Sequence, residues 1–439
     1  MERQRTKRFG GPRWTRRDVL RGLAGGVAVP YLVPSGLIGW SGQPAPSSRI
    51  TTALIGAGDR GRQIIAGGDR VVAVCDVDAK RRSQAKQQID AAAGDQSCRE
   101  YGDFREVLDR DDVDAVVIAT PDHWHVPMAI AAIRAGKAVY VEKPLSLTVA
   151  EGRRLADLVR RYGGILQVGS QQRSDEKFIR ACELVRNGRL GRVHTIRVTI
   201  VGRPGPASGP WTPQPVPPEL DYEMWLGPAP WAPYHKDRCH YNFRFVSDYS
   251  GGDMTNWGAH HMDIVQWALD ADGSGPVQIT AQGKRHPTGL HDTFFDVEAE
   301  YLYPGDVRVL LRSQATNIRT GGIRFEGTEG WVYVSREKIE ADPPSLLTTQ
   351  IGPNEIHLAP EGGPSTHMGI WLDCIRRRNP KGLTAPAEVG HRSATVCHLA
   401  NIAMELGRPL RWDPAAEQFP DVPEANRLLL RTPRQPWAI

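Results

Sequence analysis

Between residues 49 and 170, short apolar runs alternate with longer segments that suit helices. The apolar runs are ITTALIG, RVVAVCD, DAVVIAT, AVYVEKP and ILQVGS, at residues 50–56, 70–76, 114–120, 138–144 and 165–170. The intervening segments predict helices over residues 60–67, 78–94, 104–110, 125–137 and 148–163. Strands that alternate with helices in this way predict an α/β fold with a parallel sheet covered on both faces.

The pattern changes after residue 170. A helix is expected over residues 176–188 and a strand over 194–201, followed by a long irregular segment, residues 202–249, that holds ten prolines between Pro204 and Pro233. A helix over 258–270 precedes runs of alternating apolar and polar residues at 277–283, 294–304, 307–316 and 323–335, and helices are expected at 368–378 and 391–407. Alternation of this kind predicts an open, mostly antiparallel sheet with one buried face. The chain therefore divides into domains at residues 49–170 and 171–439.

The charge of the chain is unevenly distributed. The formal net charge is +5, and the excess of Lys and Arg lies in the first 21 residues. Residues 22–48 carry no charge, and the remainder of the chain is close to neutral. A body without excess positive charge argues against nucleic acid as a partner.

Residues 1–48 have the layout of a secretory signal: a basic region, an uncharged stretch and a Ser/Pro/Gly linker. Residues 15–21, TRRDVLR, resemble the twin-arginine signal, whose route exports folded proteins. We therefore expect a periplasmic or otherwise exported protein, with no stable membrane span after signal cleavage. A disordered basic tail or an uncleaved anchor is the alternative.

A nucleotide site is predicted where the first strand meets the first helix. Gly56-Ala57-Gly58-Asp59-Arg60-Gly61 fits G-x-G-x-x-G, in which glycines allow backbone N–H groups to approach a pyrophosphate at a helix N-terminus. Asp76 ends the second strand, where a carboxylate binds the ribose 2′-hydroxyl and repels a 2′-phosphate. NAD is therefore favoured, although Lys80 and Arg81 leave NADP open.

Three further segments carry a family resemblance: TPDHWH (120–125), GKAVYVEKPLSLT (136–148) and TNWGAHHMDIVQWAL (255–269). Together with the nucleotide motif they resemble the glucose–fructose oxidoreductase/inositol dehydrogenase (Gfo/Idh/MocA) family over residues 50–413, in particular its exported members with a WLGPAP segment (225–230 here). The resemblance implies an N-terminal Rossmann domain and a C-terminal α/β domain with an open sheet that commonly mediates dimers or tetramers. It also implies NAD(P)-dependent oxidation or reduction of a hydroxyl of a sugar, sugar derivative or polyol.

The family's functional lysine falls on Lys143. This residue follows a strand at the carboxyl edge of the parallel sheet, where ligands bind in doubly wound folds. Beside a cationic nicotinamide its pKa should be lowered, so that the amine can relay the proton of the substrate hydroxyl. We expect Pro144 to fix the turn through a cis peptide bond. Family position also places Thr120, Pro121, His125 and Glu142 beside the cofactor, whereas Asp122 is expected to cap a helix.

The family's second-domain Asp-x-x-x-His falls on Asn256 and His260. The spacing of four puts both on one helical face, and His260, with a usual pKa near 6.5, is the expected general acid or base. Asn256 cannot take up a proton, so it is expected either to orient His260 or to cap the helix.

Several aromatic and imidazole side chains are candidates for substrate contact. We expect Trp124, His261 and His123 to contact substrate. For the aromatic residues, packing at a subunit interface is an equally good interpretation. A metal site built from His123, His125, His260, His261 or His291 is not favoured, because no H-x-x-x-H spacing supports it. The six cysteines are scattered and suit neither a zinc ribbon nor a disulfide framework, and Cys75 is expected in the core.

Three functions follow from these observations. The first is an exported sugar oxidoreductase with tightly held NAD(H), because a freely diffusing cofactor would be lost outside the cytoplasm. The second is a redox-neutral glycoside hydrolase or lyase that oxidises a hydroxyl transiently and reduces it again. The third is a carbohydrate-binding relative without turnover.

Overall fold

The computed structural model describes residues 49–65, 67–203, 205, 209–315, 317, 320–360 and 362–437. The predicted signal and linker at residues 1–48 lie outside these residues. Among the described residues, no helix combines the length and the apolarity that a bilayer crossing needs.

Six parallel strands form the first sheet, in the spatial order β3-β2-β1-β4-β5-β6. Its strands are β1 (Thr51–Ile55), β2 (Arg70–Cys75), β3 (Arg99–Tyr101), β4 (Ala115–Ile118), β5 (Ala138–Val141) and β6 (Leu166–Val168). Its helices are α2 (Asp59–Ile65), α3 (Ala79–Ala93), α4 (Phe104–Leu108), α5 (Asp122–Arg134) and α6 (Val149–Tyr162). This order is that of a Rossmann domain and confirms the predicted fold of this half.

Both faces of this sheet are buried, as continuous apolar strands require. One cluster joins the sheet to α4, α5 and α6, and a second joins its other face to α2 and α3. Cys75 is buried in the first cluster, as expected. The short strand β3 was not predicted, because REY carries no apolar run and is ordered by pairing with β2.

The second sheet has eight strands in the order β13-β12-β11-β7-β10-β9-β8-β14. They are β7 (Val193–Val201), β8 (Gln278–Lys284), β9 (Phe295–Tyr303), β10 (Val307–Ala315), β11 (Gly322–Gly327), β12 (Gly330–Val334), β13 (Ile339–Asp342) and β14 (Leu410–Arg411). All neighbours pair antiparallel except β7 and β10. The open, mostly antiparallel sheet is confirmed, and β13 and β14 add strands that the pattern did not predict.

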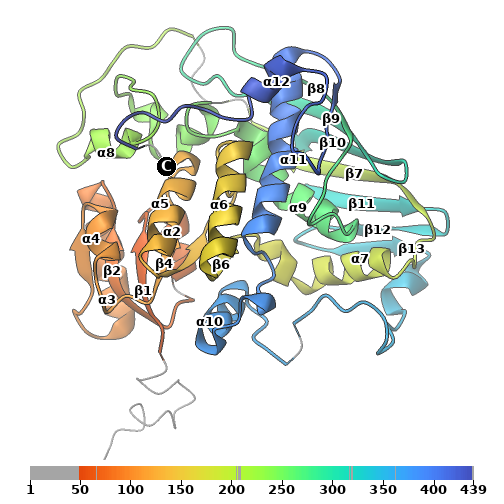
Figure 1. Ribbon diagram of the computed structural model, residues 1–439, viewed down its shortest axis with the longest axis horizontal. Coiled ribbons are helices and arrows are strands. Elements are labelled where there is room, and N and C mark those ends of the chain that lie inside the picture. Colours follow the sequence, from red (N-terminus) through yellow and green to blue (C-terminus); the bar gives the residue numbers. More distant parts are fainter. Residues whose placement is uncertain are drawn as a thin grey trace, which may run out of the picture. The chain divides into compact units, whose positions relative to one another are not determined.

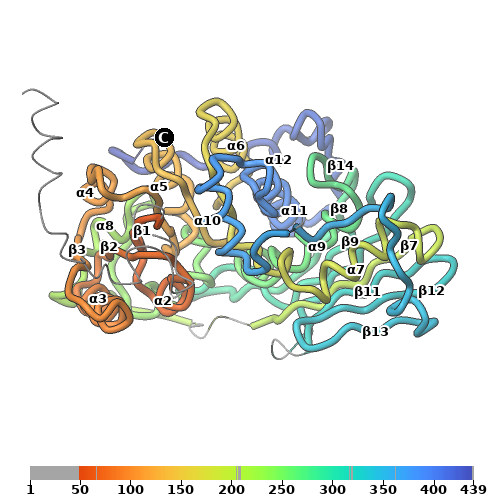
Figure 2. Tube along the Cα trace, turned by 90° about the horizontal axis from the view of Figure 1, so that it is seen from below, coloured from red at the N-terminus to blue at the C-terminus, as the bar shows by residue number. Residues whose placement is uncertain are grey.

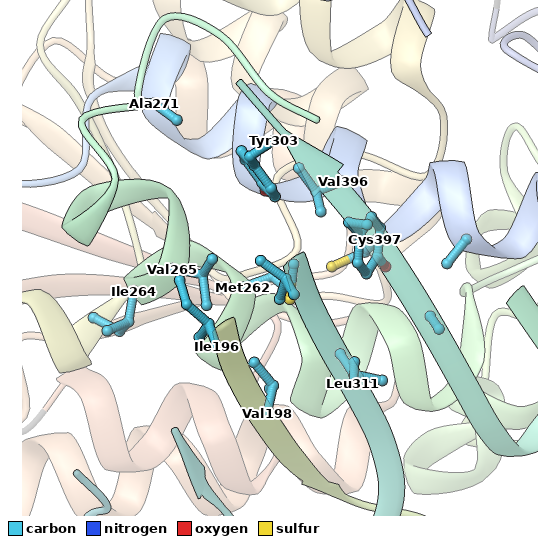
Figure 3. Close-up of a cluster of buried hydrophobic side chains, with 14 of the residues drawn as sticks. Ile196, Val198, Met262, Ile264, Val265, Ala271, Tyr303, Leu311, Val396 and Cys397 are labelled. Carbon is cyan, nitrogen blue, oxygen red and sulfur yellow. The ribbon is translucent and has the colours of Figure 1, made fainter. Parts of the chain in front are cut away.

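Helices cover one face of the second sheet (Figures 1 and 2). The helices of this half are α7 (Glu176–Arg186), α8 (Tyr222–Leu226), α9 (Ala259–Ala268), α10 (His367–Arg377), α11 (Ala387–Leu406) and α12 (Pro423–Arg427). Inward residues of β7 and β10, such as Ile196 and Leu311, pack against Met262 of α9 and Val396 of α11 (Figure 3). Most outward positions of the same strands are polar, such as Arg197, Thr199, Arg308 and Arg312, with Leu310 as an apolar exception.

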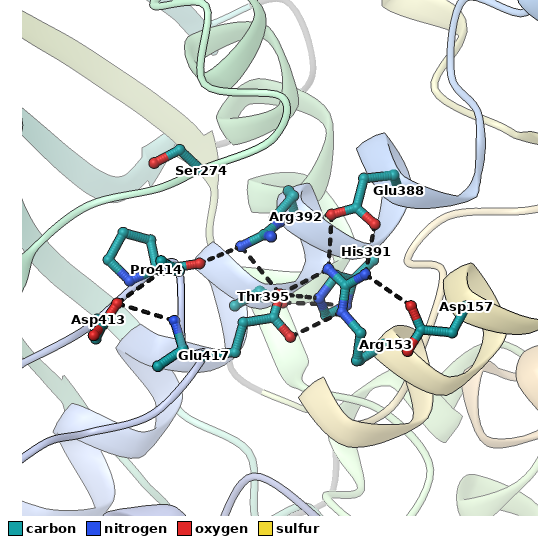
Figure 4. A network of polar contacts seen from close by, with 12 residues as sticks. Arg153, Asp157, Ser274, Glu388, His391, Arg392, Thr395, Asp413, Pro414 and Glu417 are labelled. Carbon is teal, nitrogen blue, oxygen red and sulfur yellow. Dashed lines mark hydrogen bonds and ion pairs between the residues drawn. The ribbon is translucent and has the colours of Figure 1, made fainter. Parts of the chain in front are cut away.

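Two C-terminal segments cross back to the Rossmann domain. Helix α10 places Trp371 in the cluster beneath α2 and α3, and the C-terminal Trp437 packs edge-on against Trp124 of α5. A polar network joins α6 to α11: Arg153 bonds Glu388 (2.6 Å) and Glu417 (2.8 Å) (Figure 4). These contacts join the second domain to the Rossmann domain through their helices.

The described part of residues 202–249 is more ordered than expected. It contains α8 and two 3-10 segments, Lys236–Arg238 and His240–Phe245, built around a buried aromatic cluster. Two helices also begin earlier than predicted, α5 at Asp122 and α11 at Ala387.

Candidate active site

A cavity of about 550 Å³ lies at the carboxyl ends of the parallel strands. Its lining comes from three parts of the chain: the Rossmann domain, the segment 202–249 and the second domain. Predicted residues that border it are Gly56, Gly58, Asp59, Arg60, Asp76, Thr120, Pro121, Trp124, His125, Glu142, Lys143, Asn256 and His260. Gly61, His123 and His261 are the predicted residues that do not.

The glycine loop is shaped by close backbone contacts. Gly56 has a φ of +94°, and a Cβ there would lie 2.7 Å from the backbone of Ala119. Gly61 packs against the carbonyl of Gly56, which explains why it lies behind the cavity wall. Glycine at both positions lets the loop turn tightly into α2, which is the local shape that pyrophosphate binding at a helix N-terminus requires.

Asp76 lies at the end of β2 and supports the loop. Its carboxylate accepts hydrogen bonds from the backbone N–H groups of Ala57 (2.6 Å) and Asp78 (2.8 Å). Burial raises the pKa of Asp76, while these two bonds oppose the rise. A carboxylate at this edge suits a ribose diol, and the nearby cations are already paired, Arg81 with Asp78 (3.7 Å) and Lys80 with Glu219.

The segment 202–249 lies along the same edge of the Rossmann domain. Leu220 forms an isolated antiparallel bridge with Asp78, Ala79 N–H donates to the carbonyl of Glu219 (2.9 Å), and Asp221 N–H donates to that of Val77 (3.0 Å). Trp225 and Tyr241 from this segment line the cavity. We call residues 219–244 the strap, because they reach across from the second domain to the end of β2.

The residues present fit a dinucleotide. The glycine turn, the carboxylate at the end of β2 and the open cavity match the parts of a Rossmann site. Thr120 adds an independent sign, since it borders the cavity and its buried Oγ1 has no hydrogen-bond partner in the described structure. A buried hydroxyl without a partner is costly, and a bound ligand would satisfy it.

Lys143 points from the end of β5 toward the second domain. Its Nζ donates to the backbone carbonyl of Asn256 (2.8 Å) and to Asn256 Oδ1 (3.2 Å). Burial lowers the pKa of Lys143 to about 8, with further lowering by Arg244 and Arg60 and opposition from Glu142 and Asp122. The Lys143–Pro144 peptide is cis, as expected.

Asn256 does not cap a helix. It lies in a π-helical turn, Met254–Gly258, that leads directly into α9, and no side chain caps either element. The capping interpretation is therefore wrong. The wide turn instead aims the Asn256 carbonyl and side-chain oxygen at Lys143, which makes the residue a hydrogen-bond acceptor for the ammonium form.

His260 is a neutral imidazole in this site. Burial, followed by the charges of Lys143 and Arg336, holds its pKa well below the usual 6.5. The usual value near 6.5, on which the expected role as general acid or base was based, therefore does not hold at this buried position, and the role itself stays a prediction. Its Nδ1 has no partner among the described residues, although the ring is only 8% exposed and borders the cavity. A neutral ring of this kind offers one N–H and one lone pair to a substrate hydroxyl.

Asp122 was expected to cap α5, and this is also wrong. It is the first residue of the helix, and its carboxylate accepts from Ser250 Oγ (2.6 Å) instead of from backbone N–H groups. Burial raises its pKa, while His125 and Ser250 oppose the rise. His125 lies with one ring nitrogen 2.7 Å from the Pro144 carbonyl and the other 2.9 Å from the Thr120 carbonyl. It therefore positions both turns that border the cavity.

The aromatic candidates differ in position. Trp124 borders the cavity but is 3% exposed, and its Nε1 donates to the Trp225 carbonyl (3.1 Å). His123 is buried against the same carbonyl. His261 faces Gln172 (3.4 Å) behind the wall, so a direct contact with substrate has no support from this placement.

Some residues of the site carry no local sequence signal. Arg336 and Gln172 line the cavity beside His260, and Arg244 lies near Lys143. Arg336 belongs to the polar turn between β12 and β13, which resembles any hairpin turn in the sequence. Among the described residues, no three His, Cys, Asp or Glu side chains gather as a metal site would require.

Two family comparisons cover most of the chain. Residues 50–170 match the family described as "Oxidoreductase family, NAD-binding Rossmann fold", and residues 207–439 match "Oxidoreductase family, C-terminal alpha/beta domain", both of the GFO_IDH_MocA type. The first match identifies the Rossmann domain as NAD-binding, which agrees with the cofactor predicted from the glycine loop and Asp76.

Individual relatives are more distant. The inositol 2-dehydrogenase of Salmonella typhimurium is 31% identical over 126 residues, 28% of this chain and 36% of that protein. The glycosyl hydrolase family 109 protein 2 of Shewanella sp. (strain ANA-3) is 41% identical over 118 residues, 25% of each chain. The chain spans less than half of the length of the curated relatives it matches.

A solved structure shares the fold over nearly its whole length. The aldose-aldose oxidoreductase of Caulobacter crescentus, complexed with glycerol, is 21% identical with a TM-score of 0.59, over 83% of this chain and 99% of that one. At this identity the likeness extends to the fold alone.

Proposed function

This chain belongs to the GFO_IDH_MocA oxidoreductase family, and we propose that it is an NAD-dependent oxidoreductase acting on a CH–OH group of a sugar, sugar derivative or polyol. One observation carries the proposal: Lys143, with a pKa near 8, lies between the nucleotide edge of the cavity and the Asn256–His260 pair. A group with a pKa near the working pH is suited to proton transfer.

Lys143, Asn256 and His260 have different roles in the proposed oxidation. Bound NAD+ supplies the hydride acceptor. Lys143 as a neutral amine accepts the hydroxyl proton, and the two Asn256 oxygens then stabilise the ammonium that forms. Neutral His260, which borders the cavity, holds the substrate oxygen through a hydrogen bond from its ring. In reduction the same groups act in reverse, with the Lys143 ammonium donating the proton.

The strap favours a cofactor that stays bound. Its backbone bonds to residues 77–79 and the Lys80–Glu219 pair lie at the end of β2, beside the carboxylate that suits the adenosine ribose. Covering that half of the cavity would slow dissociation, because the strap has to move before the nucleotide leaves. Tight retention is what an exported NAD enzyme needs, and we extend the proposal to export through residues 1–48 and to a dimer or tetramer.

The test is to measure NAD(H) and turnover together. Heat-denatured purified protein is expected to release close to one NAD(H) per chain, detected by absorbance and enzymatic cycling. A panel of aldoses and inositols should reduce the bound NAD+, seen as absorbance at the wavelength of NADH. Lys143→Met should abolish this reduction and keep the bound nucleotide. Protein that is empty and takes up no NAD at millimolar supply would overturn the proposal.

A second candidate function is redox-neutral glycoside cleavage on the same residues. It is favoured by the strap, which would retain the cofactor between the oxidation and the reduction, and by the similarity to a glycosyl hydrolase family 109 protein. Release of 4-nitrophenol from aryl glycosides without net accumulation of NADH is the expected sign. NADH formation in proportion to the sugar consumed would exclude it.

A further inference from the structure

Arg336 presents a charge to the cavity that no residue around it balances. It lies in the four-residue turn between β12 and β13, beside His260 and Trp257, and it borders the cavity. Among the described residues, no carboxylate lies within 4.0 Å of its guanidinium nitrogens. The carboxylates that act on it from a distance are engaged elsewhere, Glu142 with Arg60 (3.0 Å) and Asp175 with Lys177 (3.2 Å).

The Arg336 side chain is held in place by contacts that do not neutralise its charge. Its guanidinium lies over the Trp257 ring at 4.9 Å. The Gln172 amide satisfies both its neighbours when its oxygen accepts from Arg336 Nε (3.2 Å) and its nitrogen donates to the His260 carbonyl (2.7 Å). The turn itself is fixed by Ser335 Oγ, which accepts from the N–H groups of Glu337 (3.2 Å) and Lys338 (3.1 Å). Stacking and the Nε bond leave the two terminal nitrogens of the fork for a ligand.

The potential at this end of the cavity is positive. Lys143, Arg336 and Arg60 each lower the pKa of His260, and burial lowers that of Arg336 itself. An arginine stays charged even so, and a partly buried charge without a counterion is costly. A substrate that brings its own negative charge would relieve this cost.

We propose that the substrate is a sugar acid, whose carboxylate pairs with the Arg336 fork while its reacting hydroxyl lies at Lys143 and His260. The planar guanidinium matches a carboxylate through two parallel hydrogen bonds. Arg60 is already paired with Glu142 (3.0 Å) and Lys143 accepts the hydroxyl proton as a neutral amine, so Arg336 leaves one positive charge to balance. One charge suits a carboxylate better than a phosphate dianion. This inference rests on the proposed function and specifies its substrate class.

The experiment compares three probes on the NAD-loaded protein: sodium D-glucuronate, D-glucose and D-glucose 6-phosphate. Calorimetric titration should give glucuronate at least about tenfold tighter binding than glucose, with an affinity that falls as sodium chloride is raised. Arg336→Gln should reduce the ratio of glucuronate to glucose affinity by about tenfold or more, and Arg336→Lys should restore part of it.

Arg324→Gln is the matched control. Arg324 also lies over a tryptophan, Trp331 at 4.1 Å, but it pairs with Glu326 (3.1 Å) and does not border the cavity. It should leave both affinities unchanged. Equal binding of glucuronate and glucose, an unchanged ratio in Arg336→Gln, or strongest binding of the phosphate would overturn the inference. A preference for glucuronate, combined with no reduction of bound NAD+ by any sugar, would support the sugar-acid inference and would contradict the proposed oxidoreductase function.

Discussion

Replacing Asn256 by aspartate tests how this site sets the pKa of its lysine. The wild-type amide oxygen lies 3.2 Å from Lys143 Nζ, so Asn256→Asp places a negative charge at that distance. Unit charges at about 3.2 Å attract by about 5 kcal/mol at an effective dielectric constant of about 20. At about 1.4 kcal/mol per pKa unit this is a ceiling of nearly 4 units.

The expected shift is smaller than this ceiling. The amide oxygen already accepts a bond from the ammonium, and a new carboxylate pays its own desolvation cost. We therefore expect the pKa of Lys143 to rise by about one to two units, from about 8 toward about 9 to 10. A higher pKa means that the neutral amine forms only at higher pH, so the rising limb of kcat/KM for oxidation should move upward by the same amount.

Two measurements check this prediction. The first is the pH dependence of kcat/KM with the NAD-loaded protein. The second is the NMR titration of ¹³C-methylated lysines, with Lys143→Arg used to assign the signal. Asn379→Asp is the control, because Asn379 is exposed and caps a short helix through an oxygen that aspartate keeps. An unchanged or lower midpoint in Asn256→Asp would refute the idea that a charge at position 256 acts on the pKa of Lys143.

Two further changes test the loop and the domain contact. Gly56→Ala combines a positive φ with a Cβ 2.7 Å from Ala119, so it should lower both the NAD content and the free energy of unfolding. The loss should exceed that of Gly163→Ala, where φ is +62° and the Cβ meets open space. Equal losses in a urea titration would contradict the steric explanation. Arg153→Met should cost about 2 kcal/mol in urea unfolding at pH 7. Burial raises the pKa of Glu388, but hydrogen bonds from Arg153 and Arg392 outweigh it and lower this pKa from 4.5 to about 2. The stabilisation by the ion pair is therefore present above pH 4.5, and the cost of Arg153→Met should shrink as the pH falls toward 2. A cost that is constant with pH would argue against the ion pair.

Much of the fold and part of the site follow from local sequence. The apolar runs predicted five of the six strands of the parallel sheet, because each buried strand and its helix have their own periodicity. The glycine loop and Asp76 were found from local motifs in the same way, whereas Lys143 was assigned through the family resemblance that the Glu142-Lys143-Pro144 turn carries. Each motif is short, and its backbone geometry restricts which residues fit.

Tertiary structure decided what surrounds Lys143. The Asn256 carbonyl reaches it only because a π-helical turn from the second domain lies opposite β5, which no spacing in the sequence indicates. The low pKa of His260 comes from burial and from two cations distant in sequence, and the unbalanced charge of Arg336 depends on which carboxylates are already paired. Local pattern encodes elements, whereas electrostatic environment depends on distances between elements, and those arise only when the two sheets pack together.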